Sequence, residues 1–148
     1  MSRRLFAFIL AFALVAGVAA AQTAGLAVTV TYKGKGVVSE KNKVFVFLLD
    51  HPNPAPGSQP LAVQTVTRNG GTATFANVSQ PVVYVVMVYD ISGTYDGRSG
   101  PPVAGSPWAV ASKAGAPLKV EAAKTPKVTV SFNDSQLWGT PAKAKASS

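Results

Sequence analysis

The stretch VVYVVMVYD at residues 82–90 decides the fold of this chain. It consists of β-branched, aromatic and other apolar residues, which favour strands, and its single charge, Asp90, comes last. Successive side chains of a strand point to opposite faces, and here both faces are apolar. A strand with one solvated face would alternate apolar with polar residues. We therefore predict a strand in the middle of a sheet, with an apolar layer on each side.

A second run, VFVFLL at residues 44–49, has the same two apolar faces and is predicted to lie beside or opposite the first. The NGG sequence at 69–71 is a hairpin signal, and four prolines make 50–60 an irregular loop. Further short strands are predicted at 26–32, 61–68, 72–76, 108–110, 118–120 and 127–132. This spacing predicts an all-β fold, an antiparallel β-sandwich of about seven strands of the Ig-like or prealbumin-like kind.

The first 21 residues, 1–21, are predicted to be a signal peptide. A basic start, an apolar run and an AAA cleavage sequence precede Gln22. The apolar run is short for a membrane span, so we expect a secreted or periplasmic chain with no transmembrane span after cleavage. Export by the general secretory route and by the twin-arginine route both fit. Residues 22–133 are predicted to form the sandwich domain, and the low-complexity, basic segment 134–148 a partly disordered tail.

Composition limits the possible chemistry and partners. The chain has no cysteine, which excludes disulfides and thiolate metal sites. It carries a net charge of +8, but its lysines are scattered instead of gathered on one element, so we expect no nucleic-acid partner. The charge fits either a solvated surface or attraction to anionic lipid or cell-wall polymers.

The stretch GTATFANVSQPVVYVVMV at 71–88 resembles the carboxypeptidase regulatory-like, or transthyretin-like (prealbumin-like), β-sandwich. Members of that family carry Gly-x-Phe/Ala-x-Phe-x-Asn-Val/Leu, a turn, and then Tyr-x-Val-x-Val. Gly71 would turn the hairpin, Phe75 would fill the core and Tyr84 would begin the central strand. The loop 90–97 also resembles that of a group of secreted bacterial domains. The resemblance implies a non-enzymatic binding or structural module that is secreted or held in the envelope.

Two enzymatic relatives of that fold need residues that this chain lacks. Hydroxyisourate hydrolases use several His and Arg and a Tyr-Arg-Gly-Ser ending, and intradiol dioxygenases hold iron with two Tyr and two His. This chain has one histidine, His51, and ends in Lys-Ala-Ser-Ser. A serine hydrolase would need His51 beside a nucleophile, but the GRSGP sequence around Ser99 is no nucleophile elbow. We expect no enzymatic activity and no cofactor, with a hydrolase as an alternative.

The loop that follows the long strand offers one candidate metal site. Oxygen-bearing side chains alternate along it at Asp90, Ser92, Thr94 and Asp96. Ca²⁺ takes six to eight oxygens and prefers several carboxylates, so this set would bind it only weakly, in the ~mM class. The alternative is that the two aspartates accept backbone N–H bonds in Asx turns.

Four aromatic residues, Tyr89, Tyr95, Trp108 and Trp138, are candidates for contacts with a ligand or partner. Rings of this kind stack on sugars in sandwich-fold carbohydrate modules, so a carbohydrate-binding module is a second functional hypothesis. In the competing interpretation, Trp108 belongs to the core and Trp138 closes over the sandwich as a clasp.

The two doubly apolar strands lead to one more expectation. A two-sheet sandwich covers only the inner face of each sheet, so large apolar side chains should also point outward. Exposed apolar patches of that size usually mark contact sites. Either residues 135–138 fold back over this face, or a partner covers it, such as an envelope protein, a cell-wall polymer or a second copy of the chain.

Overall fold

The computed structural model describes residues 23–55 and 57–139. The predicted signal peptide, 1–21, and the end of the predicted tail, 140–148, lie outside the described residues. The described part of the chain contains no helix, and therefore none with the length and apolarity to cross a membrane. Its strands are β1 (Ala24–Tyr32), β2 (Val44–Leu49), β3 (Ala62–Val66), β4 (Thr72–Val78), β5 (Tyr84–Tyr89), β6 (Trp108–Val110), β7 (Ser112–Lys113), β8 (Ala116–Pro117) and β9 (Lys127–Phe132).

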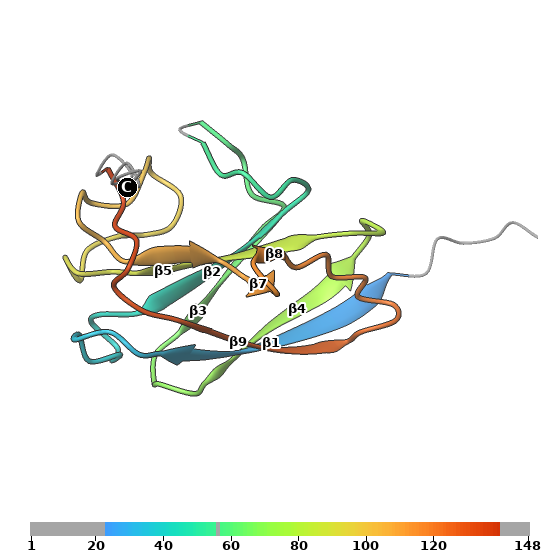
Figure 1. Cartoon of the computed structure of the whole chain (residues 1–148), viewed down its shortest axis with the longest axis horizontal. Helices are drawn as coiled ribbons and strands as arrows, with labels where there is room; N and C mark the ends of the chain where they lie inside the picture. Colours follow the sequence, from blue (N-terminus) through green and yellow to red (C-terminus); the bar gives the residue numbers. More distant parts are fainter. Residues whose placement is uncertain (1–22, 56, 140–148) are drawn as a thin grey trace, which may run out of the picture.

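The strands form two larger sheets that face one another, which confirms the all-β prediction (Figure 1). One sheet has three strands in the order β4-β1-β9, and the other has four in the order β3-β2-β5-β6. Strands β7 and β8 form a small hairpin of their own. In Figure 1, β1 and β9 lie in the lower layer and β2 and β5 in the upper layer.

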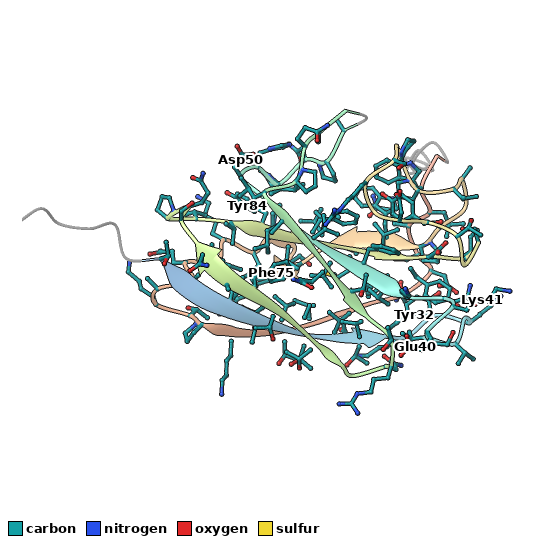
Figure 2. The ribbon with its side chains drawn as sticks, turned by 180° about the vertical axis from the view of Figure 1, so that it is seen from behind. Tyr32, Glu40, Lys41, Asp50, Phe75 and Tyr84 are labelled. Atoms are coloured by element: carbon teal, nitrogen blue, oxygen red, sulfur yellow. The ribbon has the colours of Figure 1, made fainter. Side chains whose placement is uncertain are left out.

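The inner faces of the two sheets share one apolar core, which we call the inner core. The predicted alternation is seen directly, because every second residue of β1 from Leu26 to Tyr32 is buried, and the same holds for β9. Phe75 of β4 is 2% exposed and lies between the layers (Figure 2). At one end of the inner core the rings of Tyr32 and Tyr89 stack with centroids 4.5 Å apart.

Strands β2 and β5 lie at the centre of the four-stranded sheet, as the sequence predicts. They pair antiparallel, with Phe47 opposite Val86. All six residues of β2 are buried, and so are all residues of β5 except Tyr84. Their outward side chains form a second buried group, which we call the outer cluster: Phe45, Phe47, Leu49, Val86 and Val88. Both faces of these strands are therefore covered.

Two details differ from the predicted strands. β1 and β9 pair in parallel, with Val28 opposite Val128, so the prediction of a wholly antiparallel arrangement is wrong at this pair. A half-buried strand shows the same alternation of apolar and polar residues whether it pairs parallel or antiparallel. The sequence pattern therefore does not distinguish parallel from antiparallel pairing. Residues 118–120 form no strand: only Val120 makes a bridge, to Val83, and the short hairpin β7–β8 precedes this segment.

The described part of the predicted tail returns to the four-stranded sheet. The Trp108 N–H donates to Gln136 O at 3.0 Å, and the Trp138 N–H donates to Ser106 O at 2.8 Å. The Trp138 ring meets that of Trp108 edge-on, with centroids 5.5 Å apart. Residues 135–138 therefore do fold back onto the domain, which is one of the two covers expected from the sequence.

Two loops rise on the outer side of the four-stranded sheet, away from the three-stranded one (Figure 1). The first joins β2 to β3 and spans 50–61, and the second joins β5 to β6 and spans 90–107. Figure 2 shows Asp50 at the point where the first loop leaves β2. The outer cluster lies beneath these loops.

Candidate functional site

A pocket of about 520 Å³ lies on the outer side of the four-stranded sheet, between the two loops. Its floor is made by the outer cluster and β3, with Phe47, Leu49, Val63, Val86 and Val88. Its walls come from residues 54–55 and 57–61 of the first loop and from residues 95–102, and Trp138 also lines it. Ligand pockets of small molecules typically have this volume and a mostly apolar lining.

Asp90 holds the start of the second wall in place. It is 2% exposed, and its carboxylate accepts hydrogen bonds from Ser92 N–H at 2.9 Å, Ser92 Oγ–H at 2.6 Å and Tyr95 N–H at 3.0 Å. These bonds fix the backbone at Tyr95, whose ring packs edge-on against Phe45 with centroids 4.9 Å apart. The Tyr95 hydroxyl donates to Gly100 O at 3.3 Å, which ties the two ends of this wall together.

Asp96 organises the next turn in the same way. One carboxylate oxygen accepts from the N–H groups of Arg98 and Ser99, both at 2.8 Å, and the other from Ser99 Oγ–H at 2.5 Å. These donors, the Ser99 side chain first, lower the pKa of Asp96 from 3.8 to about 2. Between them, Gly97 has φ +75°, and a Cβ there would come within 2.7 Å of the Phe45 ring. Only glycine lets this turn lie so close to the outer cluster.

The predicted Ca²⁺ site falls on these same residues. The structure brings Asp90 and Ser92 into contact, and Thr94 Oγ1–H donates to Ser92 Oγ at 3.1 Å, while Asp96 faces the turn that follows. The carboxylate oxygens accept N–H and O–H donors of their own loop, which is the Asx-turn arrangement of the alternative interpretation. Within residues 23–55 and 57–139, no three His, Cys, Asp or Glu side chains gather as a metal site would require.

The loop that forms the other wall contains a hydrogen-bonded row of three residues that sequence reasoning missed, of which Ser58 lines the pocket. His51 Nδ1 lies 2.5 Å from Asp50 Oδ1, and Ser58 Oγ lies 3.5 Å from His51 Nε2. The contact with His51 lowers the pKa of the Asp50 carboxyl. Ser58 Oγ also accepts the Ala55 N–H at 3.0 Å, as in a turn cap. The sequence signal was a histidine and a serine seven positions apart in one proline-rich loop.

The structure brings together three of the four predicted aromatic residues. Tyr95 and Trp108 pack against the outer cluster, Trp138 contacts Trp108, and Tyr95 and Trp138 line the pocket. Tyr89 lies elsewhere, in the inner core, where its hydroxyl donates to Val37 O at 3.1 Å. Burial, and next the Asp90 charge, raise the pKa of Tyr89. Its ring stacks on Tyr32 and offers no open face to a sugar.

A second, open hollow of about 550 Å³ lies at the end of the inner core. There the Tyr32 hydroxyl donates to the Asp134 carboxylate, which also accepts the Lys35 N–H at 2.9 Å. Burial and the hydrogen bond to Asp134 raise the pKa of Tyr32, and the same bond lowers the pKa of Asp134. These contacts tie β1 to the C-terminal segment, so we interpret this group as structural.

Comparison of the chain with family models, curated proteins and solved structures finds no match. The interpretation of the site therefore depends on its own residues and geometry.

Proposed function

We propose that this domain is a non-enzymatic binding module that takes a small, largely apolar ligand into the outer-face pocket. One observation carries the proposal. The outward side chains of β2 and β5 are covered by two loops that leave a space of about 520 Å³ over Phe47, Leu49 and Val88, where tight packing would have closed it. The wall formed by residues 95–102 is held by Asp90 and Asp96 before any ligand arrives, which lowers the entropic cost of binding.

In this proposal the fold is a β-sandwich of the Ig-like or prealbumin-like kind, secreted or held in the envelope. Two sheets packed across one core support it, as does the burial of Phe75, the core residue of the carboxypeptidase regulatory-like motif. An envelope protein or a cell-wall polymer could present the apolar group, so a partner of that kind is compatible with the pocket.

The pocket is tested with a neutral, environment-sensitive dye such as Nile red. Leu61 lines the pocket and is 43% exposed, so Leu61→Asp places a charge in the wall without disturbing the inner core. Val37 is 77% exposed and lies away from the pocket, which makes Val37→Asp the matched control. We expect the dye to bind the wild-type chain and the control and to bind the Leu61→Asp variant at least about ten-fold more weakly. Equal dye binding by both variants would overturn the proposal.

A carbohydrate-binding module is the second candidate, because Tyr95 and Trp138 line the pocket. The chain has two tryptophans, and they contact each other. Their fluorescence therefore reports on the pocket, and a change with soluble oligosaccharides but not with the apolar dye would favour the sugar hypothesis.

A hydrolase is favoured by one observation, the row Asp50–His51–Ser58 beside the pocket. In such a row the histidine would take the serine proton as general base. If the row is catalytic, His51→Ala and Ser58→Ala should each abolish hydrolysis of a p-nitrophenyl ester. In the binding-module proposal the chain shows no such turnover, and His51→Ala, at a residue that does not line the pocket, binds the dye as the wild type does.

A further inference from the structure

The charge of the pocket lining narrows the ligand class. The described lining residues are apolar or uncharged with one exception, Arg98, which lines the pocket and is exposed to solvent. Of the polar side chains in the walls, Ser58 Oγ accepts from Ala55 N–H and the Tyr95 hydroxyl donates to Gly100 O. The pocket thus combines a mostly apolar lining with a single positively charged residue, which is solvent-exposed.

The Arg98 guanidinium has no anionic partner among the described residues. The ion pairs found there join Lys124 to Glu121 and His51 to Asp50. The acid nearest to Arg98 along the chain, Asp96, uses its oxygens for the Arg98 and Ser99 N–H groups and the Ser99 hydroxyl. Asp96 therefore fixes the backbone of Arg98 and leaves its side chain available for an ion from outside.

We propose that the pocket binds an amphiphilic carboxylate, a free fatty acid, with its alkyl chain over the outer cluster and its carboxylate on Arg98. This proposal depends on the proposed function and names its ligand. A guanidinium binds a carboxylate through two parallel N–H···O bonds, which makes arginine suited to the head group. Transfer of the alkyl chain from water to the apolar floor of the pocket lowers the free energy of the complex. This floor is formed by Phe47, Leu49, Val86 and Val88. A pocket of about 520 Å³ between two loops has room for one monomeric chain, whereas a bilayer surface would need a broad, flat contact area.

The experiment follows tryptophan fluorescence of the full exported chain during titration with dodecanoate below its micelle concentration. Dodecanol and dodecyltrimethylammonium have the same chain with a neutral and a cationic head. We expect the order of affinity carboxylate, then alcohol, then ammonium. Arg98→Gln should weaken dodecanoate about ten-fold or more and leave dodecanol unchanged, and added salt should weaken only dodecanoate.

Arg68→Gln is the matched control, since Arg68 is exposed beside the β3–β4 turn and does not line the pocket. If dodecanoate and dodecanol bind equally and Arg98→Gln changes neither, the fatty-acid proposal fails while the apolar pocket stands. If no dodecyl compound and no neutral dye binds, both proposals fail. An equal loss in Arg68→Gln, or binding to anionic phospholipid vesicles without binding of monomeric dodecanoate, also overturns the fatty-acid proposal.

Discussion

The inner core and the outer cluster belong to the same two strands but are covered in different ways. On the inner side Val46 and Met87 are fully buried against the three-stranded sheet. On the outer side Phe45 and Val88 are almost as deeply buried, but under loops. The outer cover leaves a pocket of about 520 Å³ above the sheet, whereas the hollow on the inner side lies at the end of the inner core.

The difference lies in how each cover satisfies its backbone. A sheet pairs its own N–H and C=O groups in a ladder, so its inner side chains can be purely apolar. A loop laid over an apolar face has no ladder, and its N–H groups need other acceptors. Here Asp90 and Asp96 supply them, which is why the polar residues of the 90–99 segment lie next to the most apolar strands of the chain.

The largest expected effect on stability comes from truncating one aromatic ring in each region, which compares the inner core with the outer cluster. Phe75→Ala removes a ring between two sheets that cannot close the space, so we expect a loss of about 3–5 kcal/mol in the free energy of unfolding. Phe45→Ala removes a ring under a loop that can settle onto the floor, so we expect about 2–3 kcal/mol. Denaturant unfolding measures both, and Val37→Ala, on an exposed side chain, should change the free energy by less than about 0.5 kcal/mol. An equal or larger loss for Phe45→Ala would show that the loop cover is as rigid as the sheet.

A smaller effect is expected from removing the C-terminal cover. A chain that ends at residue 133 loses the Trp138 ring, the hydrogen bonds of 136–138 to 105–108 and the Asp134 contact with Tyr32. We expect a loss of about 2–4 kcal/mol in the free energy of unfolding and more binding of a hydrophobic dye than the full-length chain shows. Trp138→Ala should reproduce roughly 1–2 kcal/mol of that loss. A truncated chain with unchanged unfolding and no more dye binding than the full-length chain would contradict this role of the tail.

Much of the fold was predictable because local sequence patterns determine the positions of its main strands. The bounds of β2 and β9 match the predicted strands, because runs of β-branched and aromatic residues strongly favour the strand conformation. The direction of β9 was not predictable, because alternation does not depend on the direction of the neighbouring strand. The hairpin β7–β8 was missed because its strands are two residues long and exposed.

The pocket was harder to predict than the fold. The sequence predicted an apolar outer face on the central strands and Tyr95 and Trp138 as candidate contact residues. It predicted that the tail or a partner covers this face, and it did not predict that the two loops do so. The loop that covers a sheet is determined by contacts between residues far apart in the sequence, such as that of the Tyr95 ring with Phe45. Contacts of this kind produce no periodic pattern in the sequence. The position of Ser58 beside His51 was hidden for the same reason, since an irregular loop sets it.

The smallest expected effect concerns the pH dependence of the pocket wall. The folded pKa of Asp96, about 2, lies below its ordinary value of 3.8, so the turn it organises is favoured above about pH 4 and loses that support as the pH falls towards 2. Amide chemical shifts of Arg98 and Ser99 should titrate across this range, while those of Val46 and Met87, which are fully buried in the inner core, stay constant. Asp96→Asn keeps an acceptor oxygen but no titrating proton, so its Arg98 and Ser99 amides should not shift between pH 4 and 2. If Asp96 were instead a ligand of Ca²⁺, millimolar Ca²⁺ at neutral pH would move these same amides. We expect no such change, because the carboxylate oxygens already accept the N–H groups of the turn.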